Sequence, residues 1–236
     1  MIVECIWEHN DGDTLLYSSN FIGAYTRGSS LQEAIKKMPK EIILYESWKG
    51  NTINEPLEIK IVQEKESTLQ ICDADSDVIF DSERKYLTIQ EYNILKDLAL
   101  KSAQDFYKQY KIIPNKDASN NIIERETFYG IVPRTARQMY LHTKNVNSYY
   151  FSQINIDANN DGTIYECRKK GFELLEKKEN FLNNKVYIAD YNEEWSLRKV
   201  LRRFIWHDRI HAKAMYKMSK NTFPDMKIEN IFDFDI

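Results

Sequence analysis

The sequence has no long apolar run that could form a membrane span. No stretch of its 236 residues approaches the roughly 20 consecutive apolar residues that a spanning helix needs. The first residues, MIVECIWEHNDGD, reach acidic side chains before an apolar signal region develops. We therefore expect a soluble, cytoplasmic protein with no membrane partner.

Cysteine is scarce, and charge of one sign is not in strong excess. Cys5, Cys72 and Cys167 are odd in number and far apart, and none belongs to a Cys-x-x-Cys pair. Neither a disulfide framework nor a cysteine zinc site is therefore predicted, and this usage fits a reducing compartment. The net charge of −3 argues against a protein whose main role is to coat nucleic acid, although a local basic face stays open.

Hydrophobic residues are plentiful and change their periodicity once along the chain. They make up 42% of the sequence, which can supply a core for one large domain or two ordinary ones. Alternating patterns typical of strands dominate up to about residue 85, and helical spacing dominates afterwards. We predict an α+β domain at residues 1–85, followed by an all-α four-helix bundle at residues 86–236.

The first 85 residues contain four strand-like segments and one helix signal. IVECIWE and TLLYSS flank the turn signal HNDGD and predict a hairpin, and further strands are expected at FIGAYTRG and LEIKIVQ. Ser30 and Glu33 form a capping box before a helix that we expect to be broken or kinked at Pro39. The polar segment DADSDVIFDSERK is interpreted as the boundary between the domains.

The remaining residues carry apolar side chains at helical spacing. Thr88 and Glu91 make a second capping box, and the helix that follows is expected to end before Pro114. A polar loop, NKDASNN, comes next. Four helices are predicted, at residues 88–113, 133–153, 165–182 and 193–220, and helices joined in this way suggest a four-helix bundle.

Three of the four histidines lie on apolar stripes of these helices. Steps of three and four residues place His207 and His211 on the seam of the last helix, and the same spacing places His142 on that of the second. Side chains at i and i+4 have Cβ atoms about 5 to 6 Å apart, close enough to hold one ion through nitrogens at about 2.0 to 2.1 Å. His142 would complete a set of three imidazoles.

Two interpretations of these histidines stay open. They can be core histidines satisfied by other side chains, as a lone inward histidine usually is. Alternatively they hold one metal ion, which satisfies three acceptor nitrogens at once, whereas unpartnered buried polar groups cost about 1 to 3 kcal/mol each. Such a centre leaves coordination positions open for water or substrate. Tyr149, Tyr150 and Trp206 fall near the predicted site, where core packing is their default role.

The segment EEWSLRKVLRRFIWHDRIHAKAMYK, with an inward histidine on an earlier helix, resembles the DinB-like (YfiT-like) superfamily of four-helix metal-binding proteins over residues 86–236. The resemblance implies that His142, His207 and His211 bind a divalent metal, and we expect zinc or nickel because imidazole suits both. It also implies metal-assisted attack by a small thiol on a small-molecule substrate, as in thiol-dependent transferases. No residue identifies the thiol or a general acid or base, and Asp208 should point away from the ion.

The N-terminal segment WEHNDGDTLLYSSNFIGAYTRGSSLQEAI resembles a HicB-like domain, a partial RNase H-like fold. HicB-like domains are associated with toxin and nucleic-acid partners, so the resemblance implies an alternative: a non-catalytic binding or regulatory protein with a structural metal. No helix-turn-helix pattern accompanies the domain here, which argues against nucleic acid as a partner. A metal-dependent transferase or hydrolase is the first interpretation, with substrate and oligomeric state unassigned.

Three further patterns are interpreted as structural. DANNDGTIYECR opens like a calcium loop, but its twelfth position is Arg168 instead of glutamate, so we predict a polar turn without calcium. The helix from Glu193 to Lys220 carries eight basic residues against three acidic ones, which we interpret as a solvated face that complements the helix dipole. His9 is expected at the surface in the hairpin turn.

Overall fold

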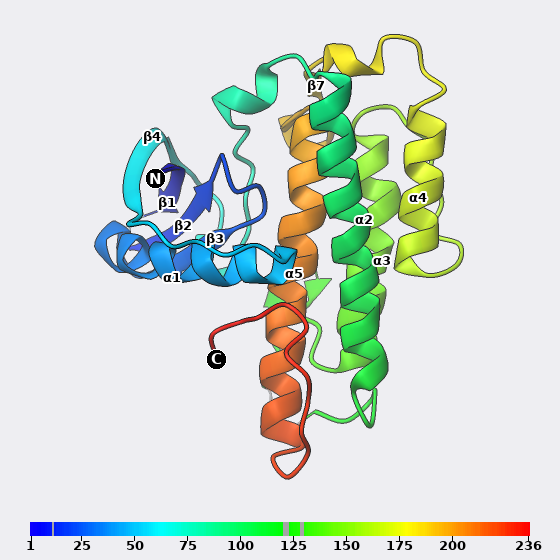
Figure 1. The fold of residues 1–236 in the computed structure, drawn as a ribbon. Helices are drawn as coiled ribbons and strands as arrows, with labels where there is room; N and C mark the ends of the chain where they lie inside the picture. Colours follow the sequence, from blue (N-terminus) through cyan, green and yellow to red (C-terminus); the bar gives the residue numbers. More distant parts are fainter. Residues whose placement is uncertain (11, 120–122, 128–129) are drawn as a thin grey trace.

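A four-stranded sheet forms the N-terminal part of the structure, and long helices form most of the rest (Figure 1). The computed structural model describes residues 1–10, 12–119, 123–127 and 130–236. The predicted order, a sheet region followed by helices, is confirmed.

The sheet has the strand order β3-β2-β1-β4. Its strands are β1 (Ile2–Asn10), β2 (Asp13–Ser18), β3 (Tyr25–Gly28) and β4 (Glu58–Glu66). β1 and β2 pair antiparallel, as the predicted hairpin requires, while β4 pairs parallel with β1 on its other side. The turn signal of the hairpin includes residue 11, which lies outside the described residues.

Both faces of the sheet are covered, each by a different part of the chain. Val3, Cys5 and Leu16 belong to the main core, to which helix α1 (Leu31–Lys49) also contributes. The opposite face meets the segment after the sheet and the last helix in a second cluster, formed by Ile6, Leu15, Tyr17, Tyr25, Ile71, Val78, Phe80 and Trp206. The segment that we interpreted as a polar boundary is therefore partly core.

Helix α1, from Leu31 to Lys49, is continuous. The Ser30 side chain caps it by accepting a hydrogen bond from the Glu33 N–H, as predicted. Of the two outcomes predicted at Pro39, a break or a kink, the break is wrong, because the helix runs on through this residue. Ile42, one turn later, is fully buried in the main core, and such packing offsets the backbone hydrogen bond that proline cannot make.

Four further segments form helices α2 (Ile89–Ile112), α3 (Ala136–Ser152), α4 (Ile164–Leu175) and α5 (Leu197–Thr222). α4 ends before the predicted residue 182, and Phe181–Asn183 form a separate 3-10 turn. α5 begins after the predicted residue 193, because Ser196 caps it. Short strands pair as β5 (Glu126–Thr127) with β6 (Gly130–Ile131) and as β7 (Tyr187–Ile188) with β8 (Glu194–Trp195).

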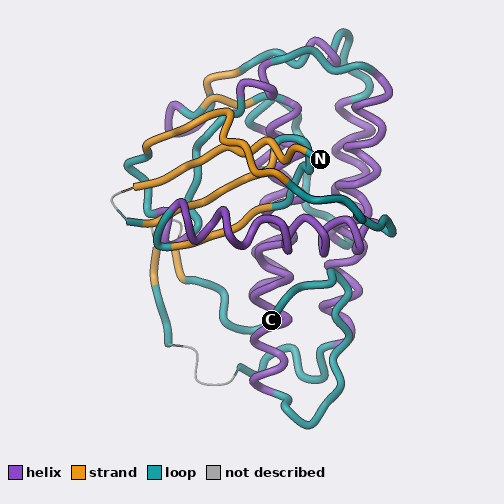
Figure 2. The backbone as a smooth tube through the Cα atoms, turned by 60° about the vertical axis from the view of Figure 1, so that its left-hand side comes forward, coloured by secondary structure: helices purple, strands orange, loops and turns teal. Residues whose placement is uncertain are grey.

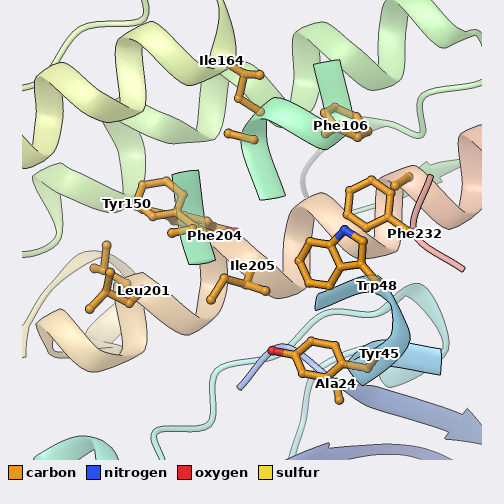
Figure 3. Packing of buried hydrophobic residues seen from close by; sticks show 14 of the residues in the cluster. Ala24, Tyr45, Trp48, Phe106, Tyr150, Ile164, Leu201, Phe204, Ile205 and Phe232 are labelled. Atoms are coloured by element: carbon orange, nitrogen blue, oxygen red, sulfur yellow. The ribbon is translucent and has the colours of Figure 1, made fainter. Parts of the chain in front are cut away.

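The first half of helix α5 is enclosed by the rest of the molecule. It packs against α2 and α3 on one side and against the sheet region on the other (Figures 1 and 2). Figure 3 shows Phe204 of α5 facing Tyr150 of α3, with ring centroids 5.4 Å apart, and Ile205 on the side of Trp48. The turn at Gly23 (φ 100°) approaches Ile205 so closely that a Cβ atom there would overlap its side chain.

Lys199, Arg202 and Arg209 of α5 are buried, so the predicted solvated face is wrong for these residues. Lys217 and Lys220 near the end of the helix are exposed, as predicted. Arg202 Nη2 donates to Glu83 Oε2 at 3.0 Å, and Arg209 Nη2 donates to Glu41 Oε1 at 2.7 Å. All four side chains are buried. The physical reason is that α5 has protein on both sides, so its basic flank meets acids of the N-terminal region in place of water.

A third buried ion pair lies between helices α2, α4 and α5. Arg168 of α4 donates through both terminal nitrogens to the Asp208 carboxylate, with 3.0 Å between Nη2 and Oδ1. Arg168 Nη1 also donates to the carbonyl of Ala99 at 3.1 Å, and neither charged side chain has exposed surface. The arginine at the twelfth position of the calcium-like pattern therefore lies in the core, where its charge is neutralised.

Replacing Arg168 by methionine should lower the free energy of unfolding by about 3 to 5 kcal/mol, because Asp208 is then buried without a cation. Urea denaturation measures the loss. The double variant Arg168→Met/Asp208→Leu should recover most of it, since no uncompensated charge remains. Lys37→Met, which breaks an exposed pair with Glu33, should leave the urea midpoint unchanged. Equal losses in the single and double variants would contradict this account.

Candidate metal centre

Two helices bring the three predicted histidines together. His142 comes from α3, and His207 and His211 lie one turn apart on α5. Their ring centroids are 4.4 Å apart for His207 and His211, and His142 lies 4.7 Å from His211 and 5.2 Å from His207. One nitrogen of each ring lies within 4.8 Å of those of the other two.

This spacing suits a metal ion after small adjustments of the side chains. Three atoms no more than 4.8 Å apart surround a point at most about 2.8 Å from each (4.8 divided by √3), and metal–imidazole bonds need about 2.0 to 2.1 Å. Small rotations of the rings close that difference. The group could therefore hold a metal ion, and within the described parts of the chain no second group of three histidine, cysteine or acidic side chains meets the same spacing.

Burial keeps the three imidazoles neutral. His207 is only 8% exposed, and burial lowers its pKa well below 6.5, with further lowering by the neighbouring His211 and His142. Burial also lowers the pKa of His142, and burial together with His142 lowers that of His211 to about 3. A neutral imidazole has a free lone pair, which is the form that binds a metal.

The imidazoles have no hydrogen-bond partners among the described residues. Nδ1 of His207 is fully buried and unpaired, and such a group costs about 1 to 3 kcal/mol when nothing satisfies it. Tyr150 contacts the His207 ring edge to face at 5.9 Å, which supplies apolar packing without an acceptor. Unpaired acceptor nitrogens on three adjacent rings fit a bound cation better than a set of satisfied core histidines.

The three rings lie in the wall of a cavity of about 280 Å³. Tyr149 and Tyr150 of α3 and Trp206 of α5 line the same cavity, so these aromatics lie near the site as their positions predicted. The other walls come from the segment after the sheet, from β6 with the loop that follows it, and from residues just before β8. A small molecule can therefore reach the position that a metal would occupy.

Sequence reasoning missed the charged side chains of this cavity. Asp73, Asp75 and Arg203 line it, although the two acids lie in the segment interpreted as a domain boundary and Arg203 was assigned to a solvated face. The available signal was the group of acids in DADSD. Such a group in a polar segment is typical of an exposed loop, so the pattern alone does not indicate a binding site.

Two other residues considered from the sequence lie outside the cluster. His9 lies at the end of β1 and not in the turn, where it stacks on Trp7 at 4.0 Å and its Nε2 lies 3.1 Å from Glu64 Oε1. Asp208 points away from the imidazoles into its pair with Arg168, as expected from its position next to His207. Neither side chain can serve the centre.

Comparisons of the chain with protein-family models, with curated proteins and with solved structures give no match. Every helix in the described parts of the chain is too short or too polar to cross a membrane. The geometry and chemistry of the cavity are therefore the grounds on which a function is proposed.

The metal-free protein should lose stability as the pH falls below about 6.5. Its unfolded chain takes up protons at His207 and His211 near the ordinary histidine pKa of about 6.5, whereas the folded chain takes them up only at lower pH. Their contribution to the free energy of unfolding is complete above that pH. Below it, each histidine removes up to about 1.4 kcal/mol per pH unit.

Urea unfolding of the metal-free protein between pH 7 and pH 5 measures this loss. The variant His207→Gln lacks one of the titrating groups, so its free energy of unfolding should fall less steeply with pH than that of the wild type. Parallel pH dependences for the two proteins would show that His207 does not stay neutral in the folded state.

Proposed function

We propose that the protein is a metal-dependent enzyme in which His142, His207 and His211 hold one zinc or nickel ion in the wall of a substrate cavity. The observation that carries this proposal is the convergence of three unpaired, neutral imidazoles on one cavity. Three protein ligands leave coordination positions open, and imidazole suits both metals. When bound, the ion would supply Lewis-acid chemistry or hold a thiol as its thiolate.

The reaction that we propose is a thiol-dependent transfer or a related metal-assisted reaction such as hydrolysis. The resemblance of the bundle to the DinB-like superfamily supports the thiol. The chain itself would bind and orient the substrate, because Tyr149, Tyr150 and Trp206 offer an apolar surface beside the imidazoles that keeps water from the reacting atoms. The DinB-like identity of the bundle and the HicB-like identity of the sheet region are part of this proposal.

A regulatory protein with a structural metal is the alternative, and the HicB-like resemblance supports it. Two observations favour the enzyme. The imidazoles open onto a cavity, whereas structural zinc sites are closed by four protein ligands. The helices that carry them are also held by interactions that need no metal, such as the buried pair of Arg168 with Asp208. Removal of the metal should therefore leave the protein folded.

Replacing either His207 or His211 by alanine should remove most of the bound metal, because the two imidazoles that remain hold an ion weakly. The protein is loaded with zinc or nickel, desalted and assayed by elemental analysis. His9→Ala is the matched control and should keep its metal, since His9 lies on β1 beside Glu64. Stoichiometric metal in His207→Ala would leave only the interpretation of three buried histidines.

The pH at which metal is lost gives a second readout of the same site. The lowered pKa values of the histidines move this loss below pH 6.5, the value that unperturbed imidazoles would predict.

Chelation and turnover then separate the two functions. The enzyme interpretation is supported if the protein stays folded in EDTA and if only the metal-loaded protein catalyses the reaction of 2-mercaptoethanol with 1-chloro-2,4-dinitrobenzene. Unfolding in EDTA without turnover supports a structural metal.

A further inference from the structure

A four-residue segment, Asp75–Val78, which we call the strap, passes between the sheet and α5. On the sheet side it is bound by the buried carboxylate of Glu8. This carboxylate accepts hydrogen bonds from the Ser76 hydroxyl at 2.6 Å, from the Asp77 N–H at 3.1 Å and from the Val78 N–H at 3.3 Å. One buried acid of β1 thus holds three consecutive residues of the strap.

Basic side chains of α5 bind the strap from the opposite side. Arg203 Nη1 donates to the carbonyl of Ser76 at 3.0 Å, and Lys199 Nζ donates to that of Asp77 at 2.7 Å. Arg202 Nη2 donates to the carbonyl of Val78 at 2.9 Å. The strap therefore has little freedom to move, and Asp75 at its beginning is presented to the cavity from a rigid support.

Asp75 is buried, with 8% of its surface exposed, and lines the same cavity as the three imidazoles. The other charged side chains of the cavity wall have partners. Asp73 pairs with Arg125, Glu193 lies 3.8 Å from Lys199, and Arg203 binds the strap. Apart from the imidazoles, Asp75 is the one ionisable lining residue whose side chain makes no hydrogen bond or ion pair with any described residue; its backbone N–H donates to the Gln70 carbonyl at 3.3 Å.

The Asp75 carboxylate is not part of the cluster in which one nitrogen from each ring lies within 4.8 Å of the others. It is therefore not placed as a ligand of the same ion. A metal at the imidazoles and a carboxylate at Asp75 would occupy two separate points of one cavity. A ligand that uses both points needs a metal-binding group at one end and a group complementary to a carboxylate at the other.

We propose that Asp75 binds a protonated amino group of a small substrate whose other end coordinates the metal. This inference rests on the proposed function, because it assigns a substrate class to the same site. A buried carboxylate without a hydrogen-bonded counter-charge gains most from a charge-assisted hydrogen bond with a cation. The cavity of about 280 Å³ limits the substrate to a small molecule.

The surroundings of Asp75 agree with a positively charged ligand. Burial and the neighbouring Asp73 raise the pKa of the Asp75 carboxyl, and a bound cation would oppose that rise. Arg203 and Arg125 act on Asp75 through their charge, but neither donates a hydrogen bond to it.

Three thiols of similar length test the proposal on the zinc-loaded protein. Cysteamine carries a positive charge, 2-mercaptoethanol is neutral, and 3-mercaptopropionate is negative. Calorimetry measures the affinity of each thiol for the wild type and for Asp75→Asn. Because each thiol is compared with itself on the two proteins, intrinsic differences in affinity between the thiols cancel. We expect Asp75→Asn to weaken the binding of cysteamine about tenfold and to change the binding of 2-mercaptoethanol by no more than about twofold. The binding of 3-mercaptopropionate should not be weakened.

Asp73→Asn is the matched control, because Asp73 lines the same cavity but is already paired with Arg125. This variant should change cysteamine binding far less than Asp75→Asn does. If Asp75→Asn does not fold, as judged by circular dichroism, Asp75→Ser replaces it in the same comparison. Equal binding of cysteamine to wild type and variant, or equal weakening of cysteamine and 2-mercaptoethanol, overturns the inference.

Elemental analysis of the same samples distinguishes the two levels of failure. If the wild type binds no zinc, the proposed function fails and this inference fails with it. If zinc is bound at the imidazoles but cysteamine binding does not depend on Asp75, the metal site stands and the assignment of an amine substrate alone is wrong.

Discussion

A long basic helix can be buried on both sides only where its guanidinium groups meet carboxylates or backbone carbonyls. Helix α5 satisfies this constraint with acids from the N-terminal region, through Arg202 with Glu83 and Arg209 with Glu41. Removing either acid would leave a buried charge without compensation, which costs more than the pair contributes. The sheet region and the helices are therefore mutually dependent, although their sequence patterns are those of separate units.

The same constraint explains the chemistry of the histidines on this helix. Among the described residues no acid forms an ion pair with His207 or His211, and the helix borders a cavity instead. Burial then lowers the pKa of these imidazoles, so the rings avoid an uncompensated charge by staying neutral. Neutral rings with unpaired nitrogens are suited to binding a metal, so the burial of α5 and the proposed function have one physical origin.

The strap shows how the N-terminal region takes part in the site. Glu8 binds it from the sheet, and Lys199 and Arg203 bind its carbonyls from α5. Basic side chains of α5 thus neutralise acids and also position a backbone segment that carries Asp75 into the cavity wall. Helices α3 and α5 alone would supply the three imidazoles and lack this acid.

The sequence alone determined the features that depend on neighbouring residues: the β1–β2 hairpin, the cap of α1 by Ser30 and the helical spacing of His207 and His211. The tertiary structure decided the continuity of α1 through Pro39, the burial of the basic side chains of α5 and the position of Asp75 in a cavity. The physical reason is that a local pattern records which side of an element is apolar, but not which distant segment covers it. Whether a charged side chain meets water, a carboxylate or a cavity depends on that covering segment, and only the assembled fold contains it.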